Sequence, residues 1–236
     1  MTYVDPDIFQ NDWDDLTGWT SQDNAGGVSS ISPAGQLYMD LTATSSDPGR
    51  SGQLKDFGTI GTGDYYVEVN FAGDVWDGSG GTNQGLFLQF NAGTKALFFR
   101  IGNNFTAGDG IVVFSGAAYV LVYTNTWSNS STFHTLVLKV HTSQTLCDGW
   151  VDKSPALAAD FTNATCDFSS GTADGTVLLD GFGTIAGNGE YHSSYMYIGT
   201  ALLPTTSIKT INDLAKASNK TKNDLAIASA KTINDL

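Results

Sequence analysis

Two stretches in the middle of the chain decide the fold. They read Phe133-His134-Thr135-Leu136-Val137-Leu138-Lys139-Val140 and Gly149-Trp150-Val151-Asp152-Lys153. Both are rich in β-branched and aromatic residues, which favour a pleated, half-buried surface. In the first stretch apolar and polar side chains also alternate, as they do in a strand with one buried face. We therefore predict two strands here, and the rest of the sequence is placed around them.

The same pattern recurs on both sides of these stretches. Further strands are predicted over residues 36–41, 65–71, 86–90, 96–101, 111–114, 119–123, 177–180 and 194–199. Clusters of Gly, Asn, Asp and Ser between them, such as Asp77-Gly78-Ser79-Gly80-Gly81, are typical of turns. Hardly any segment has a helical period. The sequence therefore predicts an all-β sandwich or jelly roll over residues 1–203, which suffices for one buried core.

Charge divides the 236 residues at Pro204. Residues 1–203 carry six basic and 21 acidic side chains, a net charge of −15, whereas the last 33 residues carry five Lys and three Asp, a net charge of +2. We call residues 1–203 the body and residues 204–236 the tail. Binding along nucleic-acid phosphates needs clustered cations, which this chain lacks. No apolar run approaches the roughly 18 residues of a membrane-spanning helix, so neither nucleic acid nor membrane is expected as a partner.

The order of the strand motifs along the body adds a resemblance. The motifs are Phe9-Gln10-Asn11-Asp12-Trp13, Gly18-Trp19-Thr20, Gly35-Gln36-Leu37-Tyr38-Met39, the two central stretches and Tyr197-Ile198-Gly199. This order resembles the concanavalin A-like lectins and glucanases, a laminin-G-like group of jelly rolls. The resemblance covers most of residues 5–203 and implies a jelly-roll sandwich of two antiparallel sheets. Strand patterns of this kind say almost nothing about function.

The tail contains a repeat of 11 residues. Residues 208–218 recur as residues 219–229, and residues 230–236 form a third, partial copy. The unit resembles the tandem repeats at the C-termini of bacteriophage structural proteins, with Asp where those repeats usually have Gly. An 11-residue period also fits a helix at about 3.67 residues per turn, so a strand-and-turn form and a helical form both stay open. Three short repeats cannot bury a core alone.

The repeat, the acidic body and the absence of a visible signal peptide together predict a virion protein. The expected role is a non-enzymatic structural protein of a bacteriophage, either a capsid decoration or a tail or fibre component, assembled in the host cytoplasm. Strand addition through the tail would join it to other virion proteins or to identical subunits in a homo-oligomer. The apolar side chains expected to make this contact are Ile208, Ile211, Leu214, Leu225, Ile227, Ile233 and Leu236.

The alternative function is a lectin-like module that binds a surface glycan for adhesion. Trp76 and Trp127 are the candidate sugar platforms, because each lies in a polar loop context, Asp74-Val75-Trp76-Asp77-Gly78 and Asn125-Thr126-Trp127-Ser128-Asn129. Large aromatic residues in loops also serve as plugs over the end of a sandwich. The sequence leaves both roles open for the two indoles.

A third hypothesis is glycoside hydrolysis, which the resemblance to glucanases raises. The reaction normally needs two carboxyl groups that flank the scissile bond, and the glucanases of this group carry them as Glu-x-Asp-x-Glu on one strand. This chain has only Glu68 and Glu190, far apart and without that pattern. Glu68, within Val-Glu-Val, is expected at an outward polar position. An Asp pair assembled by the fold stays open, but we predict that the protein is not an enzyme.

Calcium is the one cofactor that the resemblance implies, since jelly rolls of this group often bind Ca²⁺ near the N-terminal strand or at a sheet edge. Carboxylate oxygens are suitable ligands, and a solvated acidic loop is the alternative. The candidate ligands are Asp5, Asp7, Asp12, Asp14 and Asp15. Cys147 and Cys166 lack a Cys-x-x-Cys arrangement, so a zinc site is not expected. Whether these two cysteines form a disulfide stays open.

Overall fold

The computed structural model describes residues 2–42, 49–61, 63–76, 85–92, 95–103, 105, 107–116, 118–141, 145–166, 174–183 and 189–203. The chain divides into two units, Met1–Leu203 and Pro204–Leu236, and all elements named below belong to the first. The repeats and the assembly residues from Ile208 to Leu236 lie outside the described residues. Attachment through the tail therefore stays a prediction.

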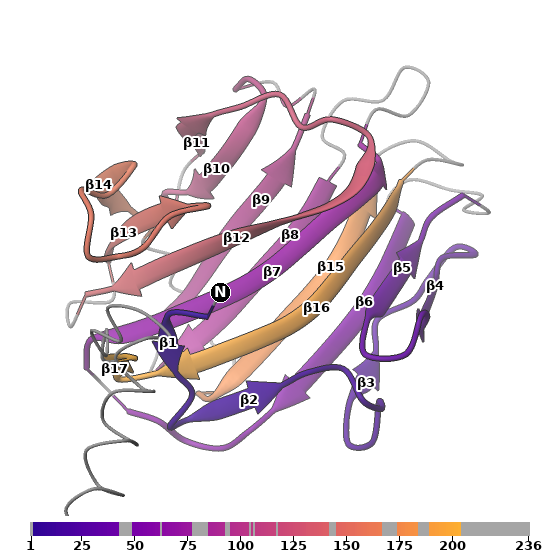
Figure 1. Cartoon of the computed structure of the whole chain (residues 1–236), viewed down its shortest axis with the longest axis horizontal. Coiled ribbons are helices and arrows are strands. Elements are labelled where there is room, and N and C mark those ends of the chain that lie inside the picture. Colours follow the sequence, from indigo (N-terminus) through magenta and orange to yellow (C-terminus); the bar gives the residue numbers. More distant parts are fainter. Residues whose placement is uncertain are drawn as a thin grey trace, which may run out of the picture. The chain divides into compact units, whose positions relative to one another are not determined.

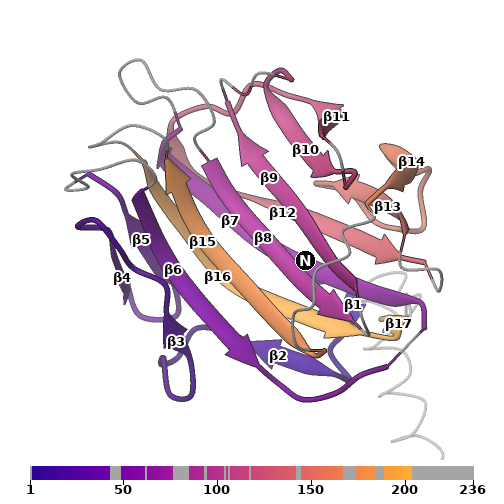
Figure 2. The same ribbon diagram turned by 180° about the vertical axis from the view of Figure 1, so that it is seen from behind.

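Seven strands of the body form one antiparallel sheet, the seven-stranded sheet (Figure 2). From edge to edge they are β11 (Tyr119–Thr124), β10 (Gly110–Phe114), β9 (Lys95–Gly102), β8 (Gly85–Ala92), β15 (Thr176–Gly183), β6 (Gly49–Asp56) and β3 (Thr20–Ser21). Every neighbouring pair in this order is antiparallel.

A second antiparallel sheet, the eight-stranded sheet, packs against the first (Figure 1). Its strands are β14 (Phe161–Thr165), β13 (Leu146–Val151), β12 (Ser130–Val140), β7 (Tyr65–Val75), β16 (Glu190–Gly199), β5 (Leu37–Asp40), β4 (Val28–Ile31) and β2 (Phe9–Asn11). β5 pairs with one end of β16 and β2 with the other end. The short strands β1 (Val4–Asp5) and β17 (Ala201–Leu202) pair with each other.

Every stretch predicted as a strand overlaps a strand of the structure. The first central stretch lies in β12 and the second overlaps β13, and these two strands pair as an antiparallel hairpin with Leu136 opposite Val151. No helix occurs among the described residues, and among them nothing helical is long and apolar enough to cross a membrane. The prediction of an all-β sandwich of two antiparallel sheets is therefore confirmed.

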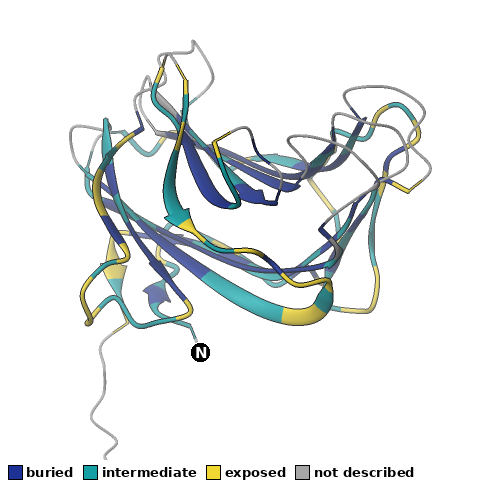
Figure 3. Cartoon of the chain, turned by 90° about the horizontal axis from the view of Figure 1, so that it is seen from above, coloured by how far each residue is buried: buried dark blue, intermediate teal, exposed yellow. Residues whose placement is uncertain are grey.

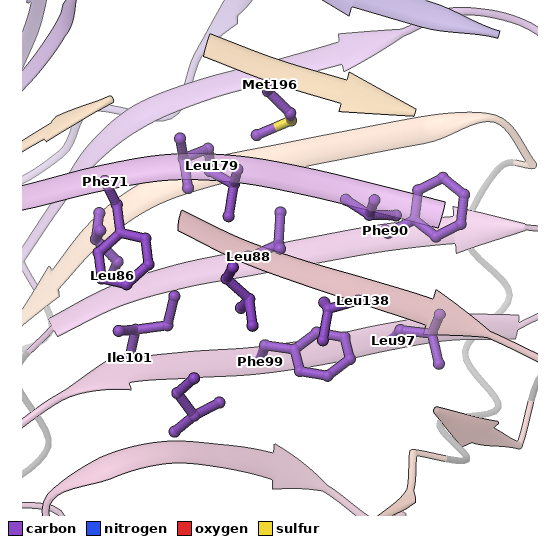
Figure 4. Close-up of a cluster of buried hydrophobic side chains, with 14 of the residues drawn as sticks. Phe71, Leu86, Leu88, Phe90, Leu97, Phe99, Ile101, Leu138, Leu179 and Met196 are labelled. Carbon is purple, nitrogen blue, oxygen red and sulfur yellow. The ribbon is translucent and has the colours of Figure 1, made fainter. Parts of the chain in front are cut away.

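The core lies between the two sheets and is built from alternate side chains of facing strands (Figures 3 and 4). Leu88 of β8, Phe99 of β9 and Leu138 of β12 are each at most 1% exposed and belong to one apolar cluster. Burying a side chain of this size contributes about 1.5–3 kcal/mol. Because successive side chains of a strand alternate between its faces, the residues next to Leu88, which are Phe87 and Gln89, point away from this core.

The N-terminal strand is fastened to the outer face of the eight-stranded sheet. Val4 packs with Val137 and Trp150 in a small second apolar cluster. Glu68 of β7 is completely buried there and accepts hydrogen bonds from the backbone N–H groups of Tyr3 (2.7 Å) and Val4 (2.8 Å). Glu68 was expected at an outward polar position of a half-buried strand. It does face outward from the core, but β1 covers it, and this burial raises the pKa of its carboxyl group.

We expect Glu68→Ala to lower the free energy of unfolding by at least about 2 kcal/mol, because each buried donor left unpaired costs about 1–3 kcal/mol. The donors are the two backbone N–H groups and the hydroxyl of Tyr195, 2.9 Å from Oε1. Urea unfolding followed by tryptophan fluorescence measures the loss. Asp14→Ala removes an exposed carboxyl group and serves as the control. Equal stability of the two variants would show that Glu68 does not hold β1 in place.

Candidate functional site

A hollow lies on the outer face of the seven-stranded sheet, opposite the core. One row of outward positions runs across four strands, with Arg100 beside Phe87, Phe87 beside Asp180 and Asp180 beside Gly52. The hollow, which we call the outer hollow, has a volume of about 410 Å³. The residues that line it are Gln22, Arg50, Leu54, Phe87, Gln89, Phe98, Arg100, Leu178 and Phe182.

Three phenylalanine rings give the outer hollow an apolar surface. The rings of Phe87 and Phe98 are stacked, with centroids 5.3 Å apart and planes 17° from parallel. Phe98 and Phe182 are partly exposed, whereas Phe87 is 9% exposed. Small-molecule sites combine apolar and aromatic walls with a few polar groups that fix the orientation of the ligand. The outer hollow has this composition, since two arginines and Gln89 line it beside the rings.

Asp180 carries a buried carboxyl group at the outer hollow. Its side chain is 0% exposed, and Oδ2 lies 2.7 Å from Nε and 2.5 Å from Nη2 of Arg50. Oδ1 has no hydrogen-bond partner among the described residues. Burial raises the pKa of Asp180 from its usual 3.8 to about 7, against the opposite influence of Arg50 and Arg100, and nearby Asp23 raises it further. The carboxyl group therefore titrates near neutral pH.

Arg100 places a second guanidinium group at the outer hollow. Its Cζ lies 4.1 Å from the ring centroid of Tyr119 and 4.6 Å from that of Phe182, so both rings make cation–π contacts with it. Its Nε is buried and has no hydrogen-bond partner among the described residues. None of the ion pairs found within the described part of the chain includes Arg100. Burial lowers the pKa of this side chain.

The glycine at position 52 makes room for the carboxyl group of Asp180. A Cβ atom on Gly52 would lie 2.1 Å from Cβ and 2.4 Å from Cα of Asp180. Real atoms do not approach so closely, and Gly52 lies directly opposite Asp180 in the pairing of β6 with β15. A side chain at position 52 would therefore push β6 away from β15. Sequence reasoning did not identify any residue of the outer hollow as a site residue.

The two indoles expected as sugar platforms are buried. Trp76 is 1% and Trp127 is 2% exposed, and their rings stack with centroids 5.8 Å apart. Both pack on Phe71 of the core, and the Nε1–H of Trp127 donates to the carbonyl oxygen of Gly110. Neither indole has a face open to a ligand. The structure corrects this part of the prediction, because the loop tryptophans are plugs in the core and the exposed rings lie elsewhere.

The acidic opening does not assemble a set of metal ligands. Asp7 accepts hydrogen bonds from the backbone N–H and the hydroxyl of Thr200, Asp12 accepts from the hydroxyl of Tyr197, and Asp15 accepts from the backbone N–H of Thr17. The other two acids of the opening are Asp5, which lies in β1, and Asp14, which is exposed. Among the described residues, no three or more His, Cys, Asp or Glu side chains are grouped as metal ligands.

The two cysteines are buried free thiols in the structure. The thiol of Cys147 is hydrogen-bonded to Cys166, and this contact together with burial raises the pKa of Cys147. Cys147 also lies 3.7 Å from the carbonyl oxygen of Ala164. Both side chains belong to the core cluster, and a raised pKa disfavours the reactive thiolate.

A second hollow, of about 390 Å³, lies on the outer face of the eight-stranded sheet. The residues that line it are Pro33, Gln36, Ala72, Asp74, Ser131, Phe133 and His192. Nε2 of His192 is 3.2 Å from Oδ2 of Asp74, and the imidazole packs on the ring of Tyr38 with centroids 4.8 Å apart. This second hollow has one phenylalanine where the outer hollow has three, so the outer hollow is the better candidate for a ligand with apolar faces.

Solved structures with the same fold include proteins that recognise carbohydrates. The carbohydrate recognition domain of Emp46p, in its metal-free form, is 12% identical with a TM-score of 0.52, covering 85% of this chain and 97% of that domain. Lectin I-B4 from Griffonia simplicifolia is 14% identical with a TM-score of 0.52, covering 81% of this chain and 98% of the lectin. A glycoside hydrolase family protein from Mycobacterium thermorestibile is 12% identical with a TM-score of 0.51, covering 81% of this chain and 100% of that protein.

These likenesses show the fold, which is the concanavalin A-like jelly roll that the strand motifs resemble. No protein-family model matches the chain, and no curated protein matches its sequence. The likeness to bacteriophage proteins rests on the tail, outside the described residues, and none of the reported similar structures is a virion protein. The virion role and location therefore stay predictions.

Proposed function

We propose that the protein is a lectin-like module that binds a saccharide in the outer hollow and does not hydrolyse it. The observation that carries the proposal is the stacked pair Phe87 and Phe98 beside charged and amide side chains, on a fold shared with carbohydrate recognition domains. A sugar ring has apolar C–H faces and a polar rim. Aromatic rings suit the faces, while Gln89 and the arginines suit the hydroxyl groups.

The distribution of carboxyl groups supports binding without hydrolysis. Glycosidases normally need two carboxyl groups on either side of the bond that breaks. None of the described residues that line the outer hollow is acidic. Asp180, which lies beneath them, forms an ion pair with Arg50. Glu68 and Glu190 belong to β7 and β16 of the other sheet. The outer hollow therefore has groups that hold a sugar but no visible acid and nucleophile pair.

The test is a glycan array followed by titration calorimetry with the glycans that bind. We expect Phe98→Ala to weaken binding by about tenfold, which corresponds to about 1.4 kcal/mol and is typical of the loss of an aromatic contact. Phe133→Ala is the matched control, since it removes a phenylalanine from the second hollow. Two results would contradict the proposal: no glycan is bound, or Phe133→Ala abolishes binding while Phe98→Ala leaves it unchanged.

A further inference from the structure

The outer hollow concentrates positive charge in an acidic body. Residues 1–203 contain six basic side chains and 21 acidic ones, yet two of the six, Arg50 and Arg100, line this one hollow. Among the described residues, the carboxyl group that forms an ion pair with one of them is that of Asp180, which pairs with Arg50. At the outer hollow two arginines therefore face the carboxyl groups of Asp180 and nearby Asp23, whereas the body as a whole carries −15. This concentration of guanidinium groups favours the binding of an anionic ligand here over the rest of the acidic body.

The two arginines differ in whether they form an ion pair within the described residues. Arg50 donates from Nε to Oδ2 of Asp180. Arg100 takes part in none of the ion pairs within the described residues, and its buried Nε has no partner there. A buried polar group without a partner costs free energy, so such groups are normally satisfied by protein, water or ligand. The same consideration applies to Oδ1 of Asp180, which is also buried and unpaired within the described residues.

The rings around Arg100 determine how it can bind. Tyr119 and Phe182 both contact the guanidinium group, and contacts of this kind are made by its flat face. The N–H groups point outward in the plane of the guanidinium, where they form paired hydrogen bonds with the oxygens of a carboxylate, sulfate or phosphate. A guanidinium held by rings loses little conformational freedom when it binds such a group.

We infer that the saccharide bound in the outer hollow is acidic and that Arg100 binds its carboxylate or sulfate group. The inference rests on the proposed function and adds the chemical class of the ligand. The partly exposed ring of Phe98, which stacks on the buried ring of Phe87, contacts the apolar face of the sugar. Phe87 lies directly between Arg100 and Asp180 in the row of outward positions. The apolar face and the anionic group of one sugar residue therefore contact side chains of the neighbouring strands β8 and β9.

Titration of Asp180 makes the binding of an acidic saccharide depend on pH. The charged groups that face this carboxyl are Arg50, Arg100 and Asp23, and its pKa of about 7 places the change of charge near neutrality. Below pH 7 Asp180 becomes neutral, and both arginine charges then act on an anionic ligand. An acidic saccharide should therefore bind more tightly at pH 6 than at pH 8, whereas a neutral saccharide should not respond to this change.

The test is a glycan array with separate neutral, uronate-containing, sialylated and sulfated arms, each probed at low and high salt. We expect binding in the acidic arms that salt weakens. Arg100→Gln should reduce this binding by at least about tenfold, the loss of one charge-assisted hydrogen-bonding group. At pH 8, where the carboxyl group is ionised, Asp180→Asn removes the negative charge beside the arginines and should strengthen the same binding. The uronate, sialylated and sulfated arms distinguish a carboxylate from a sulfate.

The outcomes separate this inference from the proposed function. Binding of neutral glycans alone would overturn the inference and leave the proposed function standing. No binding in any arm would remove the proposed function and the inference with it. Acidic binding at pH 8 that is equal in wild type, Arg100→Gln and Asp180→Asn would place the anionic group elsewhere and overturn the inference. If Arg100→Gln does not fold, the comparison of wild type with Asp180→Asn at pH 8 decides: tighter acidic binding by the variant supports the inference, and unchanged binding overturns it.

Discussion

Replacing Trp127 by alanine is expected to lower the free energy of unfolding by about 3–5 kcal/mol, the usual cost of deleting a large buried aromatic side chain. The indole is 2% exposed and packs against the rings of Phe71, Trp76 and His134. Removing it leaves a cavity among rings that cannot close without moving β7 and β12. Since a domain of this kind is stable by about 5–15 kcal/mol, the variant should unfold at a much lower urea concentration.

Two comparisons make the Trp127 prediction specific. Trp127→Phe keeps an aromatic ring in the same place and should lose much less stability than Trp127→Ala. Phe98→Ala removes a partly exposed ring from the outer hollow, so it should affect glycan binding more than unfolding. A stable Trp127→Ala variant that fails to bind glycans would restore the indole as a sugar platform and contradict its position in the core.

The strands could be predicted because their signal is local. Alternation of apolar and polar side chains is visible within five to eight residues, and all the stretches that show it are strands. β6, which reads Gly49-Arg50-Ser51-Gly52-Gln53-Leu54-Lys55-Asp56, lacks that alternation. Its place in the sheet is determined by contacts with β15, more than a hundred residues away in the sequence. A single sequence does not reveal such a pairing.

The candidate site was missed for a related reason. Arg50 and Asp180 are separated by 130 positions, so their ion pair exists only after the sheet has formed. One signal was nevertheless present. In β8 and β9 the side chains on both faces of the strand are apolar, as in Leu86-Phe87-Leu88 and Leu97-Phe98-Phe99. In a strand with one face in solvent, apolar and polar side chains alternate instead. Aromatic rings on both faces indicate that the outer face of the sheet also contacts another group.

The sequence also contained a local signal that Trp76 is buried. Gly73 occupies an inner position of β7, and a Cβ atom there would lie 2.4 Å from Cε2 of Trp76. A glycine at an inner position of a strand indicates that another group fills the space. The polar residues around Trp76 suggested a surface loop, but the missing side chain at Gly73 gives the indole its place in the core.

Asp180→Asn is expected to remove a dependence of stability on pH amounting to a few kcal/mol between pH 4 and pH 8. The folded-state pKa of Asp180 is about 7, against an ordinary value of 3.8. Between these two pH values the folded protein binds more protons than the unfolded chain, so the unfolding free energy falls as the pH rises through this range. One unit of pKa difference corresponds to about 1.4 kcal/mol, which sets the order of magnitude.

The measurement is the difference in unfolding free energy between wild type and Asp180→Asn, from urea titrations at pH 4, 5, 6, 7 and 8. The difference is needed because other buried groups also contribute to the pH dependence of stability, among them Glu68, whose pKa is raised by burial. Asp14→Asn, which replaces an exposed carboxyl group by an amide, is the control. Asparagine nearly preserves the shape of the side chain and keeps an oxygen that can accept from Nε of Arg50, so packing changes little.

The sign of the result decides between two forces at the outer hollow. Burial disfavours the ionised carboxyl group, while Arg50 and Arg100 favour it, and a pKa near 7 means that burial prevails. Wild type should then lose stability relative to Asp180→Asn as the pH rises. If wild type gains stability instead, the arginines outweigh burial and Asp180 stays ionised down to acidic pH. The positive charge available to an anionic saccharide would then not increase between pH 8 and pH 6. The pH dependence inferred for ligand binding therefore depends on this stability measurement.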